Sequence, residues 1–88
     1  MNPGPLMIEF FGTLLLVFVI LATGNPYAIG ATLAIIVAIG GGVSGGHFNP
    51  AVTTSLVFAN KTSMNLLIPY VIVQILGGLV AYRIYKMI

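Results

Sequence analysis

The sequence predicts an all-α membrane protein that consists of three transmembrane helices and one re-entrant half-helix. The first observation behind this fold class is composition, since 59% of the 88 residues are hydrophobic and the mean hydropathy is +1.15. The second is that only 5% of the residues are charged, against roughly 25% in a typical soluble domain. The third is the presence of three apolar runs that are each long enough to cross a bilayer as a helix.

The same composition excludes several classes of function. A soluble enzyme is not expected, because three basic side chains, one acidic side chain and one histidine cannot cover a water-soluble surface. Nucleic acid is not an expected partner, since a net charge of +2 is far from a phosphate-binding patch. The chain has no cysteine and a single histidine, so neither a metal site nor a cofactor is predicted.

The three spans are expected at residues 5–23, 27–43 and 66–82. The first run would make about 28 Å of helix, and Glu9 is its only charged residue. The second and third runs contain no charge. Gly24, Asn25 and Pro26 are typical of a tight turn, so the first two spans are predicted to form a helical hairpin.

A fourth segment, at residues 44–59, is predicted to enter the membrane and return. Five glycines occupy the seven positions from Gly40 to Gly46, a density that predicts a break in regular helix. Asn49 and Pro50 then mark a helix start, because asparagine is a favoured N-cap and proline fits the first helical position. A helix from Pro50 to about Ala59 would be about 15 Å long, half the thickness of a bilayer core.

This re-entrant interpretation places polar backbone near the bilayer centre, at Asn49. Irregular backbone at that depth is tolerated only where protein covers it or where it lines a watery cavity. Three helices and one re-entrant segment leave the tip open on one side. A further element that covers the tip is therefore expected.

Three motifs resemble the aquaporin and aquaglyceroporin family. The segment Ser44–Thr53 resembles the first re-entrant loop of that family, with its Asn-Pro-Ala tip. The segment Glu9–Thr13 is similar to the Glu-x-x-Gly-Thr motif of the first span, and Gln74–Gly78 resembles the Gln-x-x-Gly motif of the third. The motifs occur in the family's order and spacing, and together they cover nearly the whole chain.

The resemblance implies roles for individual residues. The pore motif comprises Asn49, Pro50 and Ala51. The backbone carbonyls that would form a ladder for permeating molecules belong to Gly45, Gly46 and His47. Glu9 and Gln74 are expected to brace the loop through hydrogen bonds, with proton transfer by Glu9 as the alternative. The His47 side chain either packs and fixes the loop or senses protons.

The resemblance also predicts the narrow mouth of the pore, whose positions are counted from Asn49. They fall at Ile29, Val37, Gly46 and Val52. Strict water channels of the family carry an arginine at the last of these positions and often a histidine at the second. An aliphatic mouth is expected to be wider and less polar, and so to admit solutes of the size of glycerol.

Members of the family have six spans and two half-helices as inverted repeats, whereas this chain resembles the first repeat alone. Either the missing repeat comes from elsewhere or the chain is a fragment. An antiparallel homodimer is predicted to complete the pore, and by resemblance four such pores could assemble as a tetramer of dimers. The N-terminal amine and Lys61 are expected on one face, with Arg83 and Lys86 on the other, so the charges favour neither orientation strongly.

Small residues recur at every fourth position of the second predicted span. They are Gly30, Ala34, Ala38 and Gly42. Such a stripe lets another helix approach closely, although small residues are also common in membrane helices.

The predicted function is passive permeation of water or small uncharged solutes, such as glycerol, across the lipid bilayer. The alternative is a non-conducting truncated repeat that acts as a structural or regulatory partner of a full-length channel. The intact set of five glycines, the helix cap and the expected acid brace favour the channel.

Overall fold

The computed structural model describes residues 2–88, and in this range it contains helices and no strand. The α-helices are α1 (Gly4–Thr23), α2 (Pro26–Ser44), α3 (Pro50–Phe58) and α4 (Leu67–Lys86), and the short 3-10 helix η1 (Met64–Leu66) leads into α4. Three units are long and apolar enough to span a membrane: α1, α2, and η1 together with α4. The predicted all-α class with three candidate spans is confirmed.

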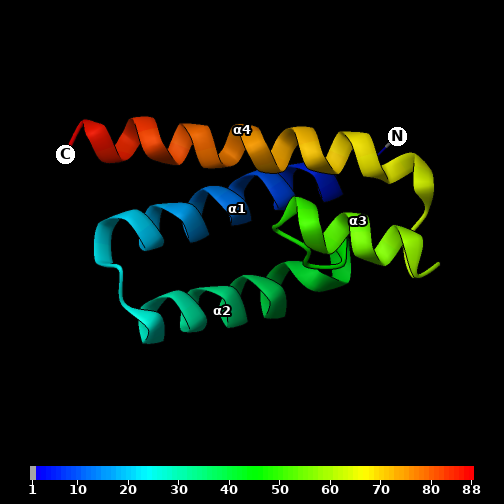
Figure 1. Ribbon diagram of the computed structural model, residues 1–88, viewed down its shortest axis with the longest axis horizontal. Coiled ribbons are helices and arrows are strands. Elements are labelled where there is room, and N and C mark those ends of the chain that lie inside the picture. The colour runs from blue at the N-terminus through cyan, green and yellow to red at the C-terminus, as the bar shows by residue number, and fades with distance from the viewer. Residues whose placement is uncertain (1) are drawn as a thin grey trace.

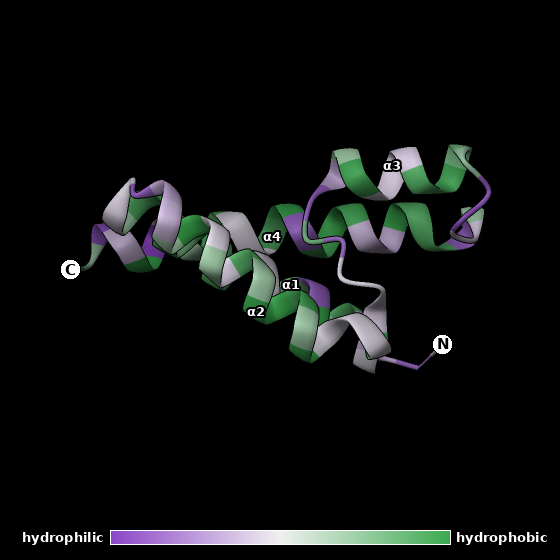
Figure 2. Cartoon of the chain, turned by 90° about the horizontal axis from the view of Figure 1, so that it is seen from below, coloured by the Kyte–Doolittle hydropathy of each residue, from purple (hydrophilic) through white to green (hydrophobic). Residues whose placement is uncertain are grey.

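The helices form an elongated bundle of 38 × 23 × 20 Å. Helix α1 lies between α2 and α4 and packs against both, whereas α3 packs against α4 (Figure 1). Seen from below, α3 runs beside one half of α4 (Figure 2). The N-terminal end of α1 and the α3–α4 connection lie at one end of the bundle, and the C-terminus lies at the other, near the α1–α2 turn (Figure 1).

Helix α3 has nine residues, which corresponds to about 14 Å of helix. It begins near the middle of the bundle and runs outward to the end at which α2 stops (Figure 1). The chain between α2 and α3 therefore turns back into the bundle before α3 leaves it. This path gives the segment its re-entrant shape.

The turn between α1 and α2 is built from local hydrogen bonds. Gly24 caps α1 in the left-handed region at φ 57°, and its N–H donates to the Ile20 carbonyl at 3.0 Å. Asn25 is the N-cap of α2, where its Oδ1 accepts the N–H groups of Tyr27 at 2.8 Å and Ala28 at 3.0 Å. Pro26, at the first position of α2, loses no hydrogen bond there.

The glycine-rich segment is more helical than its composition predicts. The expected break in regular helix is wrong for Gly40 to Gly42, which lie inside α2. A Cβ atom on Gly40 would lie 2.5 Å from Cγ2 of Ile8, so a glycine at this position lets α1 and α2 approach closely. The break comes at Gly45 and Gly46, whose φ angles of 93° and 69° are left-handed. The limb between α2 and α3 is thus only five residues long, from Gly45 to Asn49.

Candidate functional site

The site is organised around the carboxylate of Glu9, which is fully buried in α1. Oε2 accepts the backbone N–H of His47 at 3.0 Å and the hydroxyl of Ser44 at 2.7 Å. Oε1 accepts the backbone N–H of Phe48 at 2.7 Å and the amide Nε2 of Gln74 at 2.9 Å. Two donors on each oxygen fill the lone-pair sites of an ionised carboxylate. Glu9 therefore joins α1 to the end of α2, to the limb and to α4.

A second chain of hydrogen bonds connects α4 to α3 and the limb. Gln74 Nε2 also donates to Oγ1 of Thr53 at 2.9 Å, and the same hydroxyl pairs with Nδ1 of His47 at 2.8 Å. Because Nε2 donates to both Glu9 and Thr53, the orientation of the Gln74 amide is fixed. The opposite oxygen, Gln74 Oε1, has no partner among the described residues, and neither has the buried Oγ1 of Thr13.

Tyr70 and Ser44 hold the point where α2 ends. The Tyr70 hydroxyl donates to the Ser44 carbonyl at 2.7 Å, and the N–H of Gly46 donates to Ser44 Oγ at 3.1 Å. The Tyr70 ring lies 5.1 Å from the His47 ring, centroid to centroid, so the imidazole is packed and buried.

Sequence reasoning missed three members of this network, namely Ser44, Thr53 and Tyr70. One signal could have found Tyr70, because it precedes Gln74 by four residues and shares its face of the helix.

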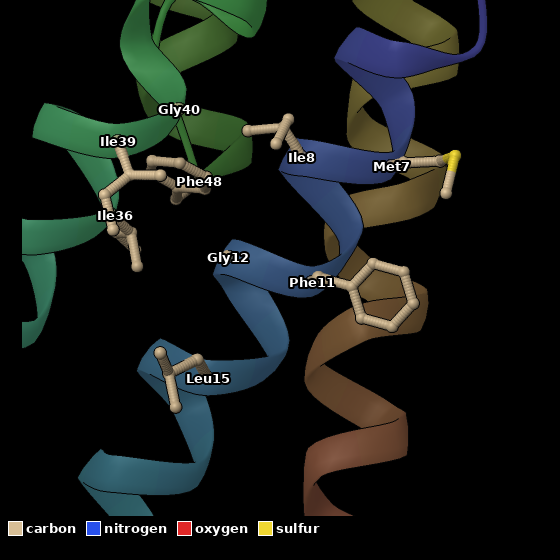
Figure 3. A pocket seen from close by; sticks show the side chains of 9 residues that line it. All are labelled: Met7, Ile8, Phe11, Gly12, Leu15, Ile36, Ile39, Gly40 and Phe48. Carbon is tan, nitrogen blue, oxygen red and sulfur yellow. The ribbon is translucent and has the colours of Figure 1, made fainter.

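Phe48 anchors the limb between α1 and α2. Its backbone is left-handed at φ 56°, and its side chain is 2% exposed. A Cβ atom on Gly12 would lie 2.1 Å from the Phe48 ring, so only glycine leaves room for the ring there. Figure 3 shows the ring beside Ile36 and Gly40, where it lines an apolar groove of about 320 Å³ between α1 and α2. The residue next to the tip is thus held by packing as well as by Glu9.

The tip itself is Asn49, which is exposed and has extended backbone. Its Oδ1 accepts the N–H of Ala51 at 2.8 Å, and its carbonyl accepts the N–H of Thr53 at 3.1 Å. Asn49 therefore caps α3, while its side-chain amide donor forms no hydrogen bond within residues 2–88.

Four consecutive carbonyls precede this cap without a donor in the part of the chain that the structure describes. They belong to Gly45, Gly46, His47 and Phe48. In a trans peptide the C=O points away from the N–H of the same plane. Since the N–H groups of His47 and Phe48 point to Glu9, the carbonyls of Gly46 and His47 point away from it.

The four positions expected to form the mouth are not all brought together in one chain. A Cβ atom on Gly46 would lie 3.4 Å from both methyls of Val37, so these two positions are in contact. Val52, in the first turn of α3, is 39% exposed. Ile29 lies in the first turn of α2, eight residues before Val37, which corresponds to about 12 Å along the helix.

Comparison with known proteins identifies the family to which this chain belongs. The model of the major intrinsic protein family matches residues 25–88, which is more than half of the chain. The chain belongs to the major intrinsic protein family. Like other members of that family, it is an integral membrane protein.

Relatives within the family cover most of this chain. It is 40% identical over 87 residues to glycerol uptake facilitator protein-like 6 of Lactiplantibacillus plantarum, an alignment with 89% of this chain and 40% of that protein. It is 36% identical to probable aquaporin PIP2-7 of Oryza sativa subsp. japonica, covering 92% of this chain and 35% of the relative. With Aquaporin Z of Brucella melitensis, the identity is 40% over 91% of this chain and 42% of the relative.

The chain thus spans about two fifths of the length of these major intrinsic proteins. No solved structure gives a significant match to it.

Proposed function

We propose that this chain forms one half of a membrane channel through which water and small uncharged solutes permeate passively. The observation that carries the proposal is the row of four carbonyls without donors, which ends at the capped N-terminus of the half-helix α3. Names of the relatives agree with this class of permeant, since they include a glycerol uptake facilitator and aquaporins.

The carbonyl row supports permeation of molecules that donate hydrogen bonds. Carbonyls buried in hydrocarbon without a donor are costly, so they require water or another hydroxyl-bearing molecule beside them. Glu9 acts as a positioning residue in this proposal, because it holds the N–H side of two peptide planes whose carbonyls belong to Gly46 and His47. A fixed row of acceptors can replace the hydration shell of a passing molecule.

The N-terminus of α3 supports exclusion of cations. A helix N-terminus carries roughly half a positive charge, and here it lies at the exposed tip beside Asn49. The free amide donor of Asn49 would bind the oxygen of water or glycerol as it passes the tip. Cations and hydrated protons would be repelled at the same point.

A second, inverted copy completes the channel in this proposal. The tip at Asn49 is exposed on one side of the chain, and an inverted half would place a second half-helix N-terminus opposite the first. Each mouth would then combine Ile29 of one copy with Val37, Gly46 and Val52 of the other. Four such dimers could assemble further as a tetramer of dimers.

The test is stopped-flow swelling of proteoliposomes that contain only the 88-residue chain. We expect water and glycerol permeabilities above those of empty liposomes. Ala51→Trp, next to the tip, should abolish the increase, whereas Ala59→Trp, at the outer end of α3, should retain it.

Two results would overturn the channel proposal. Swelling equal to that of empty liposomes would favour the non-conducting repeat. Equal swelling of the Ala51→Trp and Ala59→Trp variants would show that the permeant does not pass the tip.

A further inference from the structure

A chain of three hydrogen bonds connects the carboxylate of Glu9 to the imidazole of His47. Glu9 Oε1 accepts from Gln74 Nε2 at 2.9 Å. The same Nε2 donates to Oγ1 of Thr53 at 2.9 Å, and this oxygen pairs with Nδ1 of His47 at 2.8 Å. All four side chains are buried, with exposed fractions between 0% and 6%. The members of the chain must therefore satisfy one another.

The carboxylate determines the donor at one end of this chain. An ionised carboxylate only accepts hydrogen bonds, and an amide NH2 group only donates them. Glu9 therefore holds the Gln74 amide with Nε2 toward it, and the second hydrogen of Nε2 goes to Thr53. Toward Gln74, the Thr53 hydroxyl is thus an acceptor.

The hydrogen of the Thr53 hydroxyl has one acceptor within reach. The neighbouring Thr54 donates to the carbonyl of Pro50, four residues earlier in the chain, at 2.7 Å. Thr53 forms no equivalent bond among the described residues, and its side chain is 0% exposed. Its hydrogen therefore goes to Nδ1 of His47, which can accept only when it carries no hydrogen itself.

We infer that Gln74 donates to Thr53 and Thr53 donates to His47, so that Thr53 is a positioning residue that holds His47 in the tautomer with its hydrogen on Nε2. Glu9 holds the backbone N–H of His47, and Thr53 holds its side chain from α3. His47 is thus fixed on both sides of its Cα atom. The effect on permeation rests on the proposed function, in which the His47 carbonyl belongs to the row of acceptors. The direction of the bonds does not depend on that function.

The tautomer can be measured directly, because His47 is the only histidine of the sequence. Nitrogen-15 NMR of the reconstituted chain distinguishes a ring nitrogen that carries hydrogen from one that does not. At a pH of about 8.5, where an ordinary histidine is neutral, we expect hydrogen on Nε2 and none on Nδ1. Hydrogen on Nδ1 would overturn the inference. Free histidine also favours the expected tautomer, so a variant that reverses the bonds is needed as well.

Gln74→Glu reverses the last two bonds while it keeps the shape of the side chain. The new carboxyl group places an oxygen where Nε2 lies, and two carboxyl groups in contact share a proton because both do not ionise readily. With that proton between the two carboxyl groups, the new oxygen accepts from Thr53, and Thr53 must accept from His47. The hydrogen should therefore appear on Nδ1. An Nδ1 without hydrogen in this variant would overturn the inference.

Thr53→Val tests the positioning role without disturbing the bond between Glu9 and Gln74. It leaves buried polar groups without a partner, so the amides of His47 and Phe48 should exchange about 5-fold to about 150-fold faster. Thr53→Ser keeps the hydroxyl and should restore slow exchange. Thr54→Val is the matched control, because the Thr54 hydroxyl bonds only within α3. Equal exchange in Thr53→Val and Thr54→Val would overturn the positioning role.

Swelling of proteoliposomes separates this inference from the channel proposal. Thr53→Val should lower the water permeability, whereas Thr53→Ser and Thr54→Val should retain it. The expected tautomers and exchange rates without swelling in any chain would support the inference and overturn the channel. Normal swelling together with an Nδ1 that stays without hydrogen in Gln74→Glu would overturn the inference and leave the channel intact.

Discussion

Replacement of Glu9 by glutamine tests how the limb is held, because it removes the charge while keeping the shape of the side chain. Glutamine places an NH2 group where one carboxylate oxygen accepts two hydrogen bonds. One of the two amide orientations leaves fewer groups without a partner. In that orientation the new NH2 group replaces Oε2 and donates to the Ser44 hydroxyl, which turns to accept the bond. The backbone N–H of His47 is then left without an acceptor.

The magnitude follows from the bonds that change. A buried N–H without an acceptor costs about 1–3 kcal/mol, and each of the other three bonds loses about 1 kcal/mol when the acceptor is no longer ionised. Removal of a buried charge offsets part of this cost. We expect a net loss of about 2–4 kcal/mol in the free energy of limb opening, which corresponds to about 30-fold to about 1,000-fold in the opening equilibrium.

Amide hydrogen exchange in the reconstituted chain measures this opening directly. The amides of His47 and Phe48 should exchange faster in Glu9→Gln by the stated factor. Thr13→Val is the matched control, because Thr13 lies one turn further along the same buried face and its Oγ1 has no partner among the described residues. Exchange in Glu9→Gln within about threefold of the original chain, or equal acceleration in Thr13→Val, would refute the reasoning.

Three further predictions concern one position each on α4, on α3 and at the N-cap of α3. Gly77→Ala places a Cβ atom 2.5 Å from the Phe10 carbonyl oxygen and should lower stability by about 1–3 kcal/mol, read as a lower midpoint of thermal loss of helix by circular dichroism. In the adjacent Gly78→Ala variant, the new Cβ atom would meet its nearest neighbour at an ordinary 3.6 Å, so the midpoint should not fall. Equal midpoint shifts in the two variants would contradict the packing argument. Proteoliposomes with the original chain should take up glycerol at least as readily as those with a control aquaglyceroporin. Val52→Arg should reduce this glycerol uptake. Unchanged uptake would place Val52 outside the permeation path. Asn49→Asp keeps the cap acceptor and the helix content but adds a negative charge at the tip, so sodium flux should rise, and an unchanged flux would show that the tip does not control cations.

Much of the fold was predictable because its causes are local. Hydropathy indicated three spans, and three long apolar units are present in the structure. Asn25 and Asn49 each cap the helix that follows, and each cap bonds to N–H groups only two or three residues away. Interactions of such short range can be inferred from the order of residues alone.

The glycines show where local reasoning fails. Gly40 and Gly46 belong to the same glycine-rich segment, yet one is helical and the other is left-handed. Ile8 on α1 packs where a side chain on Gly40 would lie, so close approach of α1 requires a glycine at this helical position. The need for glycine at position 40 therefore comes from a residue far away in the sequence and not from the glycine-rich segment itself.

By itself, the sequence determined that this chain crosses a membrane, where its helices turn, and that it carries the motifs of a re-entrant loop. The tertiary structure alone decided how that loop is held. Glu9, Ser44, Thr53, Tyr70 and Gln74 are brought together from α1, α2, α3 and α4 around a limb of five residues. Their contacts depend on how closely the helices approach one another, and that distance is fixed by packing between residues far apart in the chain.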